Sequence, residues 1–306
     1  MSALERARLA DGGPYVVAVG GGHGLAATLQ AVRTYAGRIT AVVSVADDGG
    51  SSGRLRPLGL PAPGDLRRCL VALAPEGSVW SDAFAYRFTA GELEGHALGN
   101  LIIAGLAGVT GDFASALDHA AELLGTVGRV LPATEVPVSL KADVGGREVV
   151  GQVKVAEAGG LAIGGVSLVP PDPPAPEEVL RAVADADQVV IGPGSLFTSV
   201  LAACVVPGIR DALAARSGGR VYVCNLRPQV PETDGFEPVH HLDVLLAHGI
   251  TVDTMVCHHQ VTAETEWRAP ADHGVEVVAA DVAREEGDGH DPQLLGGLLR
   301  RLATGA

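Results

Sequence analysis

The chain has little positive charge, few cysteines and no long apolar run. Its 306 residues include 22 Lys and Arg against 36 Asp and Glu, which gives a formal net charge of −14. This balance disfavours non-specific attraction to nucleic acid or to an anionic membrane. No apolar run approaches the roughly 20 residues that span a bilayer, and residues 1–13 lack the apolar core of a signal peptide. We therefore expect a soluble, cytoplasmic protein with no nucleic-acid partner and no membrane insertion.

The cysteine pattern gives no sign of cross-links. Cys69, Cys204, Cys224 and Cys257 are scattered, form no CxxC pair and each lie in an apolar segment. This favours buried, reduced thiols over disulfides or a zinc site. Hydrophobic residues make up 47% of the chain, so burial can supply the stability of one large α/β domain or two smaller ones.

The order of apolar segments predicts the fold. Residues 15–19 read as a buried strand, followed by a glycine turn and apolar residues at helical spacing. A second buried strand over 39–45 follows one βαβ unit later, so a parallel pair is expected. Short Val-rich runs separated by Gly pairs indicate a β-rich insertion at 126–170, and a proline-rich connector follows at 170–176. The prediction is an α/β, Rossmann-like doubly wound fold with a mainly parallel sheet and a small β-rich insertion.

Two adjacent carboxylates, Asp47 and Asp48, follow the second predicted strand. Ligands of open α/β sheets bind beyond such strand ends, and adjacent carboxylates repel one another unless one meets a metal, solvent or hydroxyl groups. An Asx turn at the Gly49–Gly50 bend explains one Asp better than both. Ser51 and Ser52 add hydroxyl groups to this loop, and Arg54 and Arg56 follow closely enough to neutralise a phosphate or to face solvent.

Glycine loops follow two predicted strands. The first, at residues 20–24, would direct backbone amides and a helix N-terminus at an anion, although Leu25 breaks the dinucleotide pattern GxGxxG. The second, at 192–195, repeats the strand, loop and helix order, with Ser195 also readable as an ordinary N-cap. We predict a phosphate cradle at these loops, with a merely tight turn as the alternative.

Further polar residues stand at the ends of predicted elements. Asp65 is a plausible N-cap of a helix over 66–73, and His96 and Asn100 enter a helix near 98–106, where they either meet a ligand or cap it. Asn225 ends a strand before a polar loop that carries Glu232 and Asp234 as candidate acid, base or metal groups. Cys257-His258-His259 offers metal ligands, but consecutive side chains of a strand point to opposite faces, so we do not expect a metal site there.

Six ordered motifs together resemble the YvcK family of gluconeogenesis factors, which are relatives of the CofD 2-phospho-L-lactate transferases. The motifs are GGGHG at 20–24, VADDGGSSGRL at 45–55, PAPGDLRR at 61–68, GHALGNLI at 95–102, IGPGSLFTSVL at 191–201 and NLRPQVPETDGF at 225–236. The chain departs from the family pattern at His23, where Thr is usual, and at Arg227, Pro228 and Pro231, which replace Met, Thr and Gly. These changes are expected to alter ligand affinity or selectivity.

The resemblance implies a single CofD-like domain over residues 1–306 that binds a nucleotide-sugar, with UDP-N-acetylglucosamine as the associated ligand. It also implies a role that links gluconeogenic growth to bacterial cell shape and envelope synthesis. The partner proteins in envelope synthesis are not identified by the sequence, and a homo-oligomer stays open. The implied ligand-binding residues are Gly21, Gly22, Gly24, Asp47, Asp48, Gly49, Ser51, Ser52, Asp65, His96, Asn100, Gly194, Ser195, Thr198, Asn225, Thr233 and Asp234.

Three functions are weighed. The favoured function is a regulator that binds without turnover. It needs the phosphate cradles and the ribose or sugar acids, but no matched acid–base pair and no cofactor, and no catalytic residue is assigned. The alternative is a CofD-like transferase of a phospho-linked group from a nucleotide diphosphate donor, with Asp47 or Asp48 holding Mg²⁺. An NAD-dependent oxidoreductase is disfavoured by Leu25.

Overall fold

The computed structural model describes residues 9–159, 162–259 and 274–305, and all structural statements below concern these ranges. Residues 1–8, part of the segment in which the sequence shows no signal peptide, lie outside them. The helical elements are α1 (Gly22–Val32), α2 (Gly50–Leu55), η1 (Arg56–Leu58), α3 (Gly64–Leu73), α4 (Val79–Ala85), α5 (Leu98–Thr110), α6 (Phe113–Leu124), α7 (Gln152–Glu157), α8 (Glu177–Asp185), the π-helix η3 (Leu196–Leu201), α9 (Ala202–Cys204), α10 (Pro207–Ala214), α11 (Pro238–Ala247) and α13 (Pro292–Thr304).

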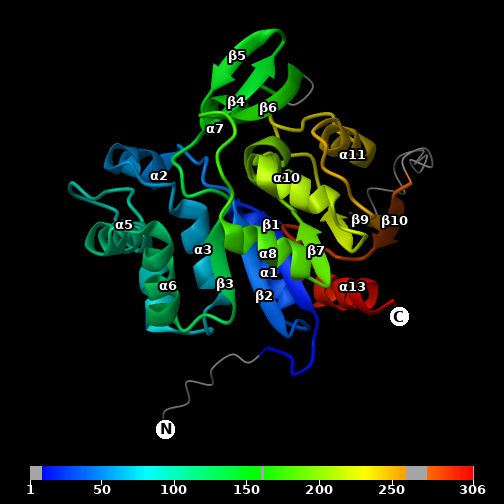
Figure 1. Ribbon diagram of the computed structural model, residues 1–306, viewed down its shortest axis with the longest axis horizontal. Helices are drawn as coiled ribbons and strands as arrows, with labels where there is room; N and C mark the ends of the chain where they lie inside the picture. The colour runs from blue at the N-terminus through cyan, green and yellow to red at the C-terminus, as the bar shows by residue number, and fades with distance from the viewer. Residues whose placement is uncertain (1–8, 160–161, 260–273, 306) are drawn as a thin grey trace.

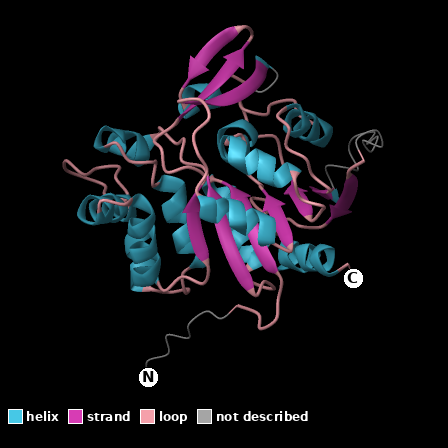
Figure 2. Cartoon of the chain, viewed as in Figure 1, coloured by secondary structure: helices cyan, strands magenta, loops and turns pink. Residues whose placement is uncertain are grey.

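A seven-stranded sheet forms the centre of the molecule (Figures 1 and 2). Its order is β10-β9-β8-β7-β1-β2-β3, and each pair of neighbours is parallel. The strands are β1 (Tyr15–Gly20), β2 (Arg38–Val43), β3 (Arg129–Pro132), β7 (Gln188–Ile191), β8 (Arg220–Val223), β9 (Thr254–His258) and β10 (Glu276–Ala280). The chain runs outward from β1 to β3 and then, after returning to β7, outward in the opposite direction. The doubly wound fold predicted from the sequence is therefore confirmed, with its switch point between β1 and β7.

Burial explains why these segments form central strands. Every residue of β1 and β7 is buried, and both are rich in Val, which suits strands covered on both faces. On one face α1 packs against α3 and α13, whereas α8 packs against α10. Figure 1 shows α8 and α10 in front of the sheet. The apolar side chains of sheet and helices form one continuous core.

A second, three-stranded sheet forms the β-rich insertion. It consists of β4 (Ser139–Val144), β5 (Arg147–Val150) and β6 (Ile163–Val169), in the order β5-β4-β6 with antiparallel pairing. Residues 129–132, which the sequence assigned to the insertion, instead form β3 and pair with β2 in the main sheet. The small sheet and α7 lie at the top of the molecule in Figure 1, over the main sheet. The insertion therefore supplies a roof over the switch point.

One further local prediction was wrong. Asp65 is not an N-cap, because α3 begins at Gly64 and Asp65 lies in its first turn. The segment after β7 begins as a π-helix at Leu196. None of the described helices alone has the length and hydropathy to cross a bilayer; Leu196–Cys204 and Pro207–Ala214, bent by 79°, reach them only as a pair.

Candidate functional site

The two glycine loops pack against each other at the switch point. A Cβ on Gly24 would lie 2.2 Å from the carbonyl oxygen of Pro193, so glycine is required there by contact between the loops. Thr28 Oγ1 fixes the same junction by donating to the carbonyl oxygen of Gly192 at 2.6 Å. Gly22 has a φ of +65°, which favours glycine, and opens α1 at this point. The N-terminus of α1 therefore meets the second loop directly.

A cavity of about 370 Å³ lies on one side of this junction. We call it the acidic pocket because four of its lining residues are carboxylic acids and one is an arginine. Its lining is Gly22, Asp47, Asp65, Arg68, Gln152, Val153, Ala156, Glu157, Ser195, Thr198, Ser199, Pro231 and Glu232. The roof helix α7, the α3 helix and the polar loop before α11 thus meet here.

Asp65 is a buried carboxylate of the acidic pocket. Arg68 Nη1 donates to its Oδ1 at 2.5 Å, and the backbone amide of Gly22 also donates to it. Burial raises the pKa of Asp65, and the neighbouring charge of Asp47 raises it further, while Arg68 opposes both effects. Asp65 thereby ties α3 to the glycine turn, and Arg68, not Arg54 or Arg56, is the arginine of this pocket.

Asp47 and Asp48 turn in different directions. Asp47 Oδ1 accepts from the amide of Gly49 at 2.9 Å, the Asx turn considered from the sequence, and Asp47 lines the acidic pocket. Asp48 instead accepts from the amides of Gln152 and Val153, both at 3.0 Å, and so caps the N-terminus of α7. Asp65, and not Asp48, is therefore the second aspartate that lines the pocket with Asp47.

The substitution Asp48→Ala tests whether this carboxylate stabilises α7. The substitution leaves two amides of α7 without their acceptor, and we expect a loss of about 1 kcal/mol in the free energy of unfolding. Asp48→Asn should recover part of this loss because its amide oxygen can still accept one bond. Chemical denaturation of the three proteins measures it, and equal stability of all three would contradict the capping role.

Glu232 is a buried carboxylate that joins two walls of the acidic pocket. Its Oε1 accepts from the amides of Phe197 at 2.8 Å and Thr198 at 3.1 Å, and its Oε2 accepts from Thr198 Oγ1 at 2.8 Å. These bonds cap η3 and favour the charged form, whereas burial raises the pKa of Glu232 and is the larger effect. The sequence indicated Glu232 as a candidate acid, base or metal group, but it did not predict these hydrogen bonds to Phe197 and Thr198.

Several predicted residues lie behind the pocket walls. Ser51 Oγ lies 3.1 Å from His96 Nδ1 and accepts from Asn100 Nδ2 at 3.0 Å, and Asn100 accepts from Arg67 Nε at 3.0 Å. All four side chains are buried in this network. These hydrogen bonds hold α2, α3 and the start of α5 together. The other predicted residues that line neither the acidic pocket nor the second cavity, described next, are Gly21, Asp48, Gly49, Ser52, Thr233 and Asp234.

A second cavity, of about 300 Å³, lies on the other side of the glycine junction. We call it the histidine pocket, after His23 and His290; its lining is His23, Gly24, Ala27, Pro193, Gly194, Asn225, Leu226, Arg227, Pro228, Gln229, Gly287, Asp288, Gly289 and His290. Asn225 clamps the second glycine loop, because its Oδ1 accepts from the amide of Gly194 at 3.0 Å and its Nδ2 donates to the same residue's carbonyl at 2.9 Å.

His290 is the unexpected member of this pocket. Burial lowers its pKa to about 4, so the ring is neutral near pH 7, and the backbone carbonyl of Cys224 is one of its partners. Its Nε2 is buried and has no hydrogen-bond partner among the described residues. The sequence gave no local signal for His290, which reaches the pocket only because the chain returns there after β10.

Comparisons with known proteins place the chain in a family. The family described as 2-phospho-L-lactate transferase CofD matches residues 16–292. A protein of Mycobacterium tuberculosis named "Putative gluconeogenesis factor" is 45% identical over 304 residues, which cover 93% of this chain and 89% of that protein. A "Gluconeogenesis factor" of Halalkalibacterium halodurans is 42% identical over 272 residues, covering 87% and 84%.

A solved structure agrees with this. A crystal structure of a UPF0052 family protein from Bacillus halodurans superposes with a TM-score of 0.84 at 36% identity, and the match covers 93% of this chain and 97% of the other.

Proposed function

Because the chain belongs to the CofD family, among the relatives named gluconeogenesis factors, we propose that it binds a nucleotide-sugar of the UDP-N-acetylglucosamine type across the acidic and histidine pockets. The relatives' name links the chain to carbon metabolism. The proposed role is that of a regulator that reports nucleotide-sugar supply to cell-shape and envelope synthesis. The observation that carries the proposal is the pair of cavities on either side of two touching glycine loops.

Each part of such a ligand meets matching chemistry. The diphosphate lies at the glycine junction, where the N-terminus of α1 and the Arg68 guanidinium favour negative charge. Sugar hydroxyl groups donate to the carboxylates of the acidic pocket, which are acceptors when ionised. In the histidine pocket, the open Nε2 of neutral His290 accepts an N–H or O–H of the nucleoside.

One observation favours the transferase alternative. Asp47 and Asp65 both line the acidic pocket, and the charge of Asp47 raises the pKa of Asp65. Two carboxylates beside a diphosphate provide oxygen ligands of the kind that Mg²⁺ prefers. If such an ion binds, Asp47 and Asp65 would hold it, and its contribution would be to neutralise charge on the diphosphate.

Calorimetric titration with UDP-N-acetylglucosamine, with and without Mg²⁺, tests the proposal, followed by analysis of the recovered nucleotide. We expect binding of intact ligand. Arg68→Gln should weaken binding at least tenfold because it removes the cation of the acidic pocket. Arg54→Gln is the matched control, since Arg54 bonds to carbonyls of Glu92 and Glu94 outside both pockets. Absent binding, or equal loss in both variants, contradicts the proposal, whereas Mg²⁺-dependent cleavage supports the transferase.

A further inference from the structure

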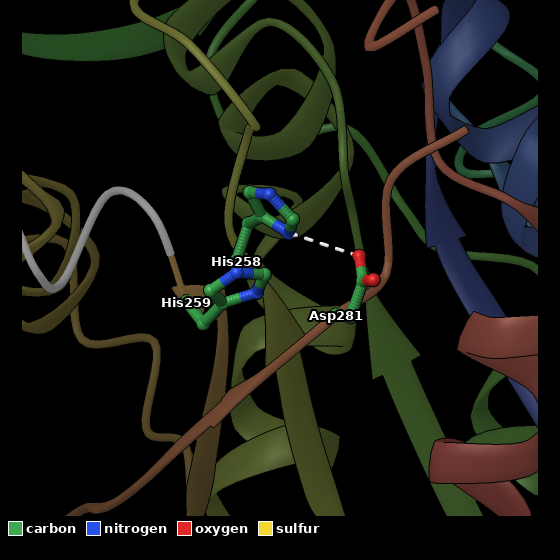
Figure 3. A group of neighbouring side chains, drawn as sticks. All are labelled: His258, His259 and Asp281. Atoms are coloured by element: carbon green, nitrogen blue, oxygen red, sulfur yellow. Dashed lines mark ion pairs between the residues drawn. The ribbon is translucent and has the colours of Figure 1, made fainter. Parts of the chain in front are cut away.

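Three side chains of types that can ligate a metal ion lie together at the ends of two strands of the main sheet. His258 is the last residue of β9 and pairs in register with Ala280, the last residue of β10. His259 and Asp281 are the next residues after these strands, so both segments leave the sheet at the same level. Figure 3 shows the two imidazole rings and the Asp281 carboxylate gathered at these strand ends.

The expectation that His258 and His259 point apart is wrong. Alternation holds only inside a strand, and β9 ends at His258. The ring centroids lie 4.5 Å apart with an interplanar angle of 57°. The two imidazoles therefore share one side of the chain.

The ligand atoms are close enough for one ion. One ligand atom from each of His258, His259 and Asp281 lies within 4.8 Å of the other two, and His258 Nδ1 is 3.7 Å from Asp281 Oδ1. A tetrahedral ion with bonds near 2.1 Å needs separations of about 3.4 Å. His259 and Asp281 are exposed and can close the difference, while buried His258 supplies a fixed point. The amide of Val282 is 3.5 Å from His258 Nδ1, at the long end of hydrogen bonding, and does not hold that lone pair firmly.

We propose that His258, His259 and Asp281 form a binding site for a divalent transition-metal ion, of which Zn²⁺ is the representative. Two imidazoles and one carboxylate suit zinc and its neighbours, whereas Mg²⁺ prefers an all-oxygen set. The site is separate from both pockets and independent of the nucleotide-sugar proposal. Its ion joins the ends of β9 and β10 and fixes the start of the segment that continues to His290.

Metal binding to the full chain, without a histidine tag, tests the site. After removal of metal by a chelator and dialysis, we expect about one Zn²⁺ per chain, a rise in Tm on addition of Zn²⁺, and a visible absorption band with Co²⁺. His259→Ala and Asp281→Asn should each lower the affinity for Zn²⁺ at least tenfold and remove the Co²⁺ band, because they leave two ligands. Both residues are exposed, so the fold should be kept, which circular dichroism checks.

His119→Ala is the matched control. His119 is exposed and lies 3.5 Å from Glu122, so it offers an imidazole and a carboxylate without a second imidazole. This variant should bind Zn²⁺ like the unchanged chain. Zn²⁺ binding that is absent from the unchanged chain, or that survives unaltered in His259→Ala and Asp281→Asn, overturns the proposal.

Discussion

The free energy of unfolding should fall by several kcal/mol as the pH drops from 7 to 4, because two histidines are buried in their neutral form. Burial lowers the pKa of both His241 and His290 from 6.5 to about 4. Between these values the unfolded chain binds a proton that the folded chain refuses, so stability is present above pH 6.5 and is lost as the pH falls towards 4. Each shift corresponds to about 3 kcal/mol.

Two carboxyl groups act in the opposite sense. The pKa values of Asp65 and Glu232 are raised, mainly by burial, above 3.8 and 4.5. Protonation of these groups therefore favours the folded state as the pH falls through their raised pKa values, and it offsets part of the loss from the histidines. The contribution of the histidines is therefore isolated by comparing the chain with a variant that lacks one of them.

Urea unfolding measured at several pH values between 7 and 4 checks this expectation. In His241→Asn the part of the pH dependence that comes from the histidines should shrink by about half, because asparagine does not titrate. Its side-chain amide can still form a hydrogen bond with Tyr222 Oη, which lies 2.9 Å from His241 Nδ1. His119→Asn, at an exposed histidine, should keep the full dependence. If His241→Asn has the slope of the unchanged chain, His241 does not carry the effect.

The sequence predicted the central sheet well because strand formation there is a local property. The buried runs at β1 and β7 are largely apolar and are each followed by a glycine turn, and such runs can be recognised without knowledge of their partner strands. The edge strand β10 was not predicted. Its residues are half buried or exposed, and its sequence shows no regular alternation of apolar and polar residues. Its assignment depends on pairing with β9.

The candidate site was less predictable because its contacts join distant segments. Asp48 finds its partner amides more than a hundred residues later, at Gln152 and Val153, and no local pattern reveals that bond. Gly24, which the sequence linked to phosphate binding, also serves the contact with Pro193, and no local pattern reveals that contact. Arg68 could have been found, because it lies three residues after Asp65 on the same helix face.

Glu232→Ala should be among the most damaging single substitutions at the site. It leaves the amides of Phe197 and Thr198 and the Thr198 hydroxyl without their acceptor in a buried place. Unsatisfied buried donors cost about 1–3 kcal/mol each before relaxation, so we expect a loss of about 3 kcal/mol or more in the free energy of unfolding. Because η3 carries Thr198 and Ser199 into the acidic pocket, binding of UDP-N-acetylglucosamine should also be lost.

Two further variants show whether the effect of Glu232→Ala comes from the loss of a buried carboxylate cap or is shared by an exposed cap. Glu232→Gln keeps one acceptor oxygen and should lie between the unchanged chain and Glu232→Ala in stability. Asp112→Ala removes an exposed carboxylate that caps α6 by accepting from the amide of Ser115 at 2.7 Å, and it should leave ligand binding intact with a smaller loss of stability. Denaturation and calorimetry on the four proteins decide the matter. Because solvent can replace the lost acceptor at Ser115 but not at buried Thr198, equal losses in Glu232→Ala and Asp112→Ala would mean that Glu232 does not hold the wall of the acidic pocket.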